Sequence, residues 1–93
     1  MEVKFDVKYH SDVKKVDLPR INVDMKLRIK KAIEERLMTD PVKYGKPLRK
    51  SLKSYWKLRV GDYRIVYNVK DNTVIIFGII NRKDVYKDIY ARL

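Results

Sequence analysis

Residues 55–67 carry cationic and aromatic side chains at a spacing that could hold a phosphate group. They predict two short strands joined by a Gly-Asp turn. On the first strand, Tyr55, Lys57 and Arg59 alternate with apolar residues, so one face is cationic and aromatic while the other is apolar. Arg64 follows just past the turn. Cations fixed on a sheet, rather than on mobile tails, favour a site that holds phosphate in a defined geometry.

The composition also favours an anionic partner. The chain has 93 residues, 38% of them charged, and a formal net charge of +11. So much positive charge on a small domain favours nucleic acid, and a basic surface that binds an acidic protein is the alternative. The length fits a single domain, residues 1–93, with one modest core.

The sequence does not support a metal-binding, disulfide-bonded or membrane-spanning protein. There is no cysteine, and His10 is the one histidine, which argues against disulfides, thiolate metal sites and histidine zinc sites. The first residues alternate in polarity and lack the apolar run of a signal peptide. The longest apolar run, residues 74–80, is far too short to span a bilayer. We therefore expect a cytoplasmic protein that uses no metal, cofactor or membrane.

The first half of the chain predicts a strand and two helices. Alternating polarity over residues 3–9 indicates a half-buried strand. Ser11 or Asp12 could cap a short helix that ends before Pro19, because the residue before proline resists helical geometry. A longer helix is expected to start after Asn22 and to end at the Asp-Pro step of residues 40–41. Its apolar residues recur every four positions, at Met25, Ile29, Ile33 and Leu37.

The second half predicts an antiparallel meander. Residues 42–54 look irregular and cationic, and strands are expected at residues 55–60, 63–70 and 73–80. The third strand is apolar on both faces and is therefore expected inside the sheet. A short helix is expected within residues 82–93, with Val85, Ile89 and Leu93 on one face. The fold class is α+β, with helices on one face of a mostly antiparallel sheet and the exposed cations on the other.

The motif residues resemble a known family. Residues 57–67 (KLRVGDYRIVY) are followed, after the next strand, by residues 80–86 (INRKDVY). Asp-Pro at 40–41 and Gly-Lys-Pro-Leu at 45–48 precede them. In order and spacing these segments are similar to the RelE/ParE superfamily of bacterial and archaeal toxins, and to its RelE branch in particular.

The resemblance implies a ribosome-dependent endoribonuclease that cuts mRNA in the decoding site. A ribose 2′-hydroxyl would attack the adjacent phosphate, giving a 2′,3′-cyclic phosphate and a free 5′-hydroxyl. This reaction requires a deprotonated 2′-oxygen, a stabilised phosphorane and a protonated leaving group. The candidate region offers cations and tyrosines but no histidine or carboxylate pair. Metal-independent catalysis would then rest on electrostatic stabilisation and on positioning by the ribosome.

The same resemblance assigns catalytic roles on the hairpin. Arg64 matches the arginine that stabilises the phosphate, and its planar fork can donate two hydrogen bonds to the nonbridging oxygens. Lys57 matches the catalytic lysine that helps to activate the 2′-hydroxyl, a role that requires its amine in the neutral form. A milder contact between Lys57 and phosphate is the alternative.

Two further catalytic residues are implied near the C-terminal end. Arg82 matches an arginine that stabilises charge on the leaving group, with Lys83 as the substitute if the register slips by one. Tyr86 matches a tyrosine that stacks on or orients the substrate base. Packing of Tyr86 in the core is the alternative, and Tyr90 is its nearest competitor.

Other cationic and aromatic residues are expected to contact RNA without chemistry. Family members often carry a cation where Tyr55 stands, and a tyrosine there could stack or hydrogen-bond instead. Contacts with the RNA backbone add salt dependence rather than sequence choice. The residues in this group are Tyr55, Arg59, Lys83, Lys46, Arg49, Lys50 and Lys53.

The resemblance also implies partners and alternatives. The expected partners are a cognate RelB-type antitoxin, the ribosome with its RNA, and mRNA, and the charge of +11 would speed association with an acidic antitoxin. One alternative is a ParE-like toxin that inhibits DNA gyrase and cuts nothing. Another is a non-catalytic protein that acts only as an antitoxin-binding or repressor partner.

Overall fold

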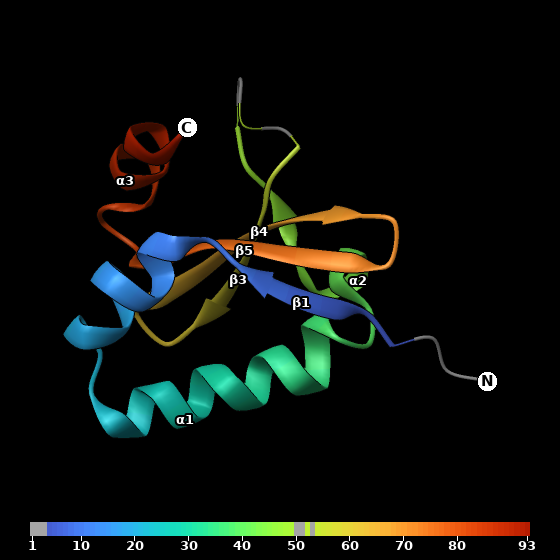
Figure 1. Cartoon of the computed structure of the whole chain (residues 1–93), viewed down its shortest axis with the longest axis horizontal. Coiled ribbons are helices and arrows are strands. Elements are labelled where there is room, and N and C mark those ends of the chain that lie inside the picture. Colours follow the sequence, from blue (N-terminus) through green and yellow to red (C-terminus); the bar gives the residue numbers. More distant parts are fainter. Residues whose placement is uncertain (1–3, 50–51, 53) are drawn as a thin grey trace.

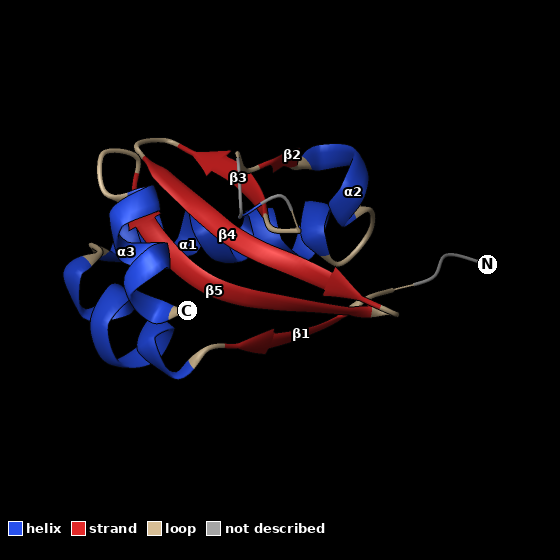
Figure 2. Ribbon diagram, turned by 90° about the horizontal axis from the view of Figure 1, so that it is seen from above, coloured by secondary structure: helices blue, strands red, loops and turns tan. Residues whose placement is uncertain are grey.

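A mixed β-sheet forms the centre of the protein (Figures 1 and 2). The computed structural model describes residues 4–49, 52 and 54–93. Within these residues the sheet has five strands in the order β1-β5-β4-β3-β2. Strands β1 and β5 are parallel, and the other neighbours are antiparallel. The strands are β1 (Asp6–Tyr9), β2 (Lys46–Pro47), β3 (Trp56–Val60), β4 (Tyr63–Lys70) and β5 (Thr73–Asn81).

Helical segments lie on both sides of this sheet. Helix α1 covers one face, and α3 stands over the other near one end (Figures 1 and 2). None of the helices among the described residues is long and apolar enough to cross a membrane. In chain order the segments are η1 (Val13–Asp17), η2 (Leu18–Arg20), α1 (Val23–Ala32), η3 (Ile33–Leu37), α2 (Pro41–Tyr44) and α3 (Val85–Arg92).

The main core lies between the sheet and the α1 layer, as the apolar periodicity predicts. The Asn22 side chain caps α1 by accepting a hydrogen bond of 2.8 Å from the Met25 amide. The helix continues into η3, so its apolar stripe reaches Leu37. That stripe packs on the inward face of the β3–β4 hairpin. The buried members include Ile29, Ile33, Leu37, Leu58, Val60, Ile65 and Tyr67.

A second, smaller core on the opposite face differs from the expected one-sided arrangement. Helix α3 buries Val85 and Ile89 against Val66 of β4 and Ile80 of β5, and Leu48 and Leu52 close this cluster. The cations therefore occupy only the part of this face that α3 leaves uncovered. The expectation that Leu93 shares the buried side of the helix is wrong, because Leu93 is 60% exposed.

Two prolines lie in the first turn of a helical segment. The longer helix ends at Leu37, before the Asp40–Pro41 step that was expected to mark its end. Pro19 lies inside η2, so the chain stays helical up to Arg20 and extends at Ile21. Pro41 is the first residue of α2, which Asp40 caps through the Lys43 amide. A proline fits the first helical position because its missing N–H has no partner there.

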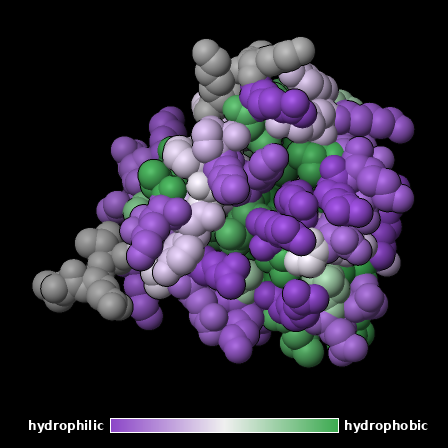
Figure 3. All heavy atoms as spheres, turned by 180° about the vertical axis from the view of Figure 1, so that it is seen from behind, coloured by the Kyte–Doolittle hydropathy of each residue, from purple (hydrophilic) through white to green (hydrophobic). Residues whose placement is uncertain are grey.

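The first strand and the region of residues 42–54 also depart from expectation. Strand β1 begins at Asp6, and Val3 lies outside the described residues. Residues 42–54 contain most of α2 and the edge strand β2, in which Lys46 pairs with Lys57. A two-residue strand that contains a proline has no periodicity from which to predict it. Figure 3 views the molecule from the side of β2 and β3, where hydrophilic side chains surround small hydrophobic patches.

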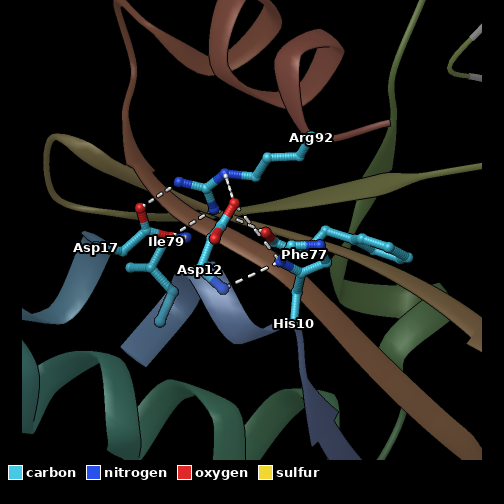
Figure 4. A network of polar contacts seen from close by, with 6 residues as sticks. All are labelled: His10, Asp12, Asp17, Phe77, Ile79 and Arg92. Atoms are coloured by element: carbon cyan, nitrogen blue, oxygen red, sulfur yellow. Dashed lines mark hydrogen bonds and ion pairs between the residues drawn. The ribbon is translucent and has the colours of Figure 1, made fainter. Parts of the chain in front are cut away.

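A buried ion pair fixes α3 against the rest of the fold (Figure 4). The Arg92 guanidinium donates two hydrogen bonds to the Asp17 carboxylate, at 2.8 Å from Nη1 and 2.6 Å from Nη2. The two side chains are only 7% and 4% exposed. Arg92 also donates to the Phe77 carbonyl, and Asp17 accepts from the Ile79 amide. The interaction raises the pKa of Arg92, chiefly through the hydrogen bonds to Asp17.

Neighbouring residues support this ion pair. The Arg92 side chain passes over Gly78, where an added Cβ would lie 3.0 Å from Nη1 and 2.5 Å from Ile80 Cδ1. The Asp12 carboxylate lies 3.7 Å from Arg92 Nε. The backbone amide of Asp12 donates a hydrogen bond to His10 Nδ1. The first helical segment, β5 and α3 are thus joined by one polar network.

We predict that Arg92→Met lowers the free energy of unfolding by about 3–5 kcal/mol, because it leaves the Asp17 carboxylate buried without its partner. Urea denaturation measures this loss. The double variant Asp17→Asn/Arg92→Met should recover part of the stability, since a neutral amide costs less to bury than a carboxylate. Arg20→Met, at an exposed arginine of η2, is the control and should change stability by less than about 0.5 kcal/mol. A loss below about 1 kcal/mol in Arg92→Met would show that the pair is energetically no better than an exposed one.

Candidate functional site

Cations from β3 and β4 meet on the same sheet face as α3, in the part of it that α3 leaves uncovered. Gly61 adopts a positive φ of 59° in the tight turn between these strands. The resulting register places Arg59 directly opposite Arg64, and Lys57 opposite Val66. Like charges at directly opposed positions repel each other. The hairpin therefore holds positive charges together against their mutual repulsion.

Arg64 is oriented by the turn itself. Its Nη1 donates hydrogen bonds to the carbonyls of Gly61, at 3.1 Å, and Tyr63, at 3.0 Å. Partial burial, followed by the charges of Arg59 and Arg82, lowers the pKa of Arg64. The contributions of Arg59 and Arg82 place Arg64 among positive charges, where a bound anion would be stabilised.

Arg82 reaches the same turn from the end of β5. Its amide donates to the Asp62 carbonyl at 2.9 Å, and its Nε lies 4.0 Å from Asp62 Oδ1. The turn and the end of β5 therefore bring Arg82 near Arg64, and the catalytic role of Arg82 stays a prediction. Lys83 is exposed, and its amide donates to the Asn81 side chain.

Tyr86 lies in the first turn of α3 and contacts Arg49. Its hydroxyl accepts a hydrogen bond of 3.1 Å from Arg49 Nε, and the guanidinium lies 4.8 Å from the ring centroid. This hydrogen bond is the main cause that lowers the pKa of Tyr86, and Lys57 adds a smaller contribution. The ring packs against the second core cluster. The packing expected as the alternative is therefore present, and the role of Tyr86 in stacking on or orienting a substrate base stays a prediction.

Lys57, Arg59 and Arg64 also line a cleft of about 380 Å³ at the outer edge of β3. Lys46 joins them from β2, and its predicted contact with RNA stays a prediction. Two further lining residues, Arg36 of η3 and Tyr44 of α2, were not anticipated. Arg36 reaches the cleft from η3, and Tyr44 reaches it because α2 and β2 fold back along the edge of β3. No local pattern in the sequence reveals either position.

The remaining candidates are placed differently. Tyr55 packs edge-on against Phe77 with ring centroids 4.9 Å apart, so its ring supports the second core. Tyr90 is about half exposed on α3. The predicted RNA contacts at Lys50 and Lys53 lie outside the described residues.

Chemically, the site combines several fixed positive charges with one tyrosine hydroxyl. Arginine forks and a lysine can bind the oxygens of a phosphate and stabilise added negative charge. A tyrosine with a lowered pKa can exchange a proton more readily than an ordinary one. Across residues 4–49, 52 and 54–93, no group of three or more histidine, aspartate or glutamate side chains could hold a metal ion.

We predict that Arg49→Ala raises the pKa of Tyr86, because the hydrogen bond and positive charge that stabilise the phenolate are lost. In the wild-type protein the phenolate therefore forms at lower pH than in the variant. NMR titration of ¹³Cζ-labelled tyrosines, assigned with Tyr86→Phe, measures the difference. Tyr67 should titrate late in both proteins, since burial raises its pKa.

Lys83→Ala is the matched control for this titration, because Lys83 is an exposed cation three residues before Tyr86. It should leave the titration of Tyr86 nearly unchanged, and Arg49→Lys should fall between wild type and Arg49→Ala. Equal Tyr86 titrations in the wild type and Arg49→Ala would show that the Arg49 contact is absent in solution.

Comparison with known proteins identifies relatives over most of the chain. The family described as "ParE toxin of type II toxin-antitoxin system, parDE" matches residues 3–86. The toxin RelG of Mycobacterium tuberculosis is 38% identical over 53 residues, which are 55% of this chain and 61% of RelG. The match thus spans about six tenths of that relative's length.

Two solved complexes contain similar chains. A chain of the toxin–antitoxin complex RelBE2 from Mycobacterium tuberculosis has a TM-score of 0.78 and 27% identity, covering 86% of this chain and 100% of its own. A chain of the RelB–RelE antitoxin–toxin complex from Methanococcus jannaschii has a TM-score of 0.66 and 28% identity. The match covers 87% of this chain and 96% of that one. These matches confirm the resemblance seen in the motif residues. The chain belongs to the ParE toxin family, within the RelE/ParE superfamily of type II toxin–antitoxin toxins.

Proposed function

We propose that this toxin is a ribosome-dependent endoribonuclease that cleaves mRNA in the ribosomal A site and so inhibits translation. One observation carries the proposal. Arg59 and Arg64 are held directly opposite each other, and Arg82 is close enough to lower the pKa of Arg64 further. A bound phosphate would relieve this repulsion, and the developing charge of a phosphorane would relieve it more.

The reaction forms a bond between the 2′-oxygen and phosphorus and breaks the bond between phosphorus and the 5′-oxygen. Arg64 would stabilise the phosphorane. Because Nη1 makes both bonds to the turn carbonyls, the fork can present Nη2 to a nonbridging oxygen. Lys57 would help to remove the proton from the 2′-hydroxyl.

The leaving group and the base are assigned to residues near α3. Arg82 would stabilise negative charge on the 5′-oxygen until it takes up a proton, since arginine itself stays charged in proteins. Tyr86 would orient the base of the substrate, with its ring held by the second core and its hydroxyl by Arg49. The ribosome would supply the remaining geometry.

A cognate antitoxin of RelB type is the proposed protein partner in the cytoplasm. Both solved structures described above are toxin–antitoxin complexes. The net charge of +11 favours rapid association with an acidic protein.

A ParE-like inhibitor of DNA gyrase is the second candidate. The family that matches residues 3–86 is named for ParE, whereas RelG and the solved complexes carry RelE-type names. The names therefore do not decide between the two activities. The cation cluster favours RNA cleavage, because it suits a phosphate that gains charge during the reaction.

We predict that the purified toxin cuts mRNA in a translation reaction and that Arg64→Ala reduces the cleavage rate by about a hundredfold or more. Mapping of 5′ ends measures the rate, and chemical analysis of the 3′ ends should find 2′,3′-cyclic phosphate. Arg20→Ala, at an exposed arginine of η2, is the control and should cleave like the wild type.

Gyrase supercoiling is assayed in parallel with the same proteins. Inhibition of gyrase without mRNA cleavage would replace the proposal with the ParE-like function. Antitoxin binding with neither activity would indicate a non-catalytic partner protein. Full cleavage by Arg64→Ala would overturn the assignment of Arg64.

A further inference from the structure

The cleft at the outer edge of β3 extends well beyond the residues assigned to the reaction. It brings together Arg36 from η3, Tyr44 from the end of α2, and Lys46 from β2. Lys57, Arg59 and Arg64 form its other side. The described residues that line it include no carboxylate. A hollow with several cations and no acid to neutralise them favours a polyanionic occupant.

The positive surface continues past this cleft. A second hollow, of about 590 Å³, shares Arg36 and Arg59 with the first and adds Arg28 of α1. Its one carboxylate on Glu35 lies 3.9 Å from the Lys31 ammonium. Glu35 thus faces a cation of its own helix, and the arginines set the charge of this surface. Cations placed one after another along a groove suit a chain of phosphates better than a single small anion.

Tyr44 adds an aromatic surface to the cleft. Its side chain is 43% exposed, so it is not a member of either core. The Lys43 ammonium lies 5.3 Å from its ring centroid. An exposed tyrosine among cations resembles the stacking platforms on which proteins bind the bases of single strands.

A third hollow among the described residues has a different character. It lies between β1 and α1, measures about 480 Å³, and its floor is formed by apolar residues such as Val7, Ile29 and Ile33. Apolar floors suit protein partners, because burying them gains hydrophobic free energy. The cleft at β3 is lined mostly by cationic side chains, which favours nucleic acid over protein there.

We propose that this cleft is a subsite for single-stranded RNA beside the scissile phosphate, with Arg36 and Lys46 on the backbone and Tyr44 under a base. The inference rests on the proposed endoribonuclease function. Lys57 lines the cleft that contains Tyr44 and also acts on the pKa of Tyr86. The RNA then runs from Tyr86 past Lys57 and Arg64 to Tyr44.

The test measures binding of a short fluorescent RNA that carries a 2′-O-methyl group at the scissile position, so that it cannot be cut. Arg36→Ala should weaken binding and reduce the slope of log K against log salt by about 0.7, the value for one phosphate contact on a single strand. Tyr44→Ala should weaken binding by roughly fivefold to 150-fold, whereas Tyr44→Phe should bind like the wild type because the ring is kept.

Lys70→Ala is the matched control, because Lys70 is an exposed cation at the far end of β4, beside the turn to β5. It should change neither the affinity nor the salt slope by a comparable amount. All four substitutions are at exposed positions and are expected to leave the fold intact, which circular dichroism verifies. In ribosome cleavage assays, Arg36→Ala and Tyr44→Ala should raise KM more than they lower kcat.

The outcomes separate this inference from the proposed function. If the wild type cleaves mRNA but Arg36→Ala and Tyr44→Ala bind RNA and cleave as it does, the subsite is wrong and the function stands. If RNA binding depends on both residues while the wild type cuts nothing, the subsite stands as a nucleic-acid site and the function fails. If the variants lose binding of an acidic antitoxin but not of RNA, the cleft is a protein-binding surface and the inference is overturned.

Discussion

The ion pair between Asp17 and Arg92 is the interaction on which the arrangement of this protein depends. A charged carboxylate removed from water must be hydrogen-bonded to persist, and Asp17 accepts from the Ile79 amide and from both terminal nitrogens of Arg92. These bonds join η1, which contains Asp17, to the interior strand β5 and to helix α3. Because α3 carries Tyr86, the same contacts set where the tyrosine stands relative to the β3–β4 hairpin. The ion pair thereby sets the position of Tyr86 beside the cations, which the β3–β4 hairpin places.

In the β3–β4 hairpin, by contrast, positive charges are held close together without a carboxylate between them. Arg59 and Arg64 repel each other across the strand pair, and Arg64 is held at the turn by carbonyl groups rather than by a carboxylate. Two apolar clusters, one on each face of the sheet, supply the stability that allows this repulsion to persist. Local rules of sequence design are commonly broken where a protein binds something, and compensation is found elsewhere in the fold.

Features with a local pattern could be predicted from the sequence, and features that depend on tertiary contacts could not. The alternation in β3 and β4 identifies both the buried Leu58 and Ile65 and the cations on the other face. The two-residue strand β2 has no period, and no local pattern shows that η3 and α2 lie beside it at the cleft, so the positions of Arg36 and Tyr44 were missed. Asp17 and Arg92 look like ordinary surface residues in the sequence, since nothing local indicates a partner 75 positions away. The placement of Arg82 and Tyr86 was expected from family resemblance rather than from their own pattern.

The pairing of β1 with β5 has a consequence for how the chain is made. Asp6 pairs with Thr73, so β1 leaves the site of synthesis about 70 residues before its partner exists. At a synthesis rate of roughly 5–20 residues per second, β1 remains unpaired for several seconds. Strands β2, β3 and β4 are made in that time, while β1 still lacks its partner β5. During synthesis β1 is therefore an unpaired, partly apolar strand. Its own fold does not yet protect it from aggregation with other chains.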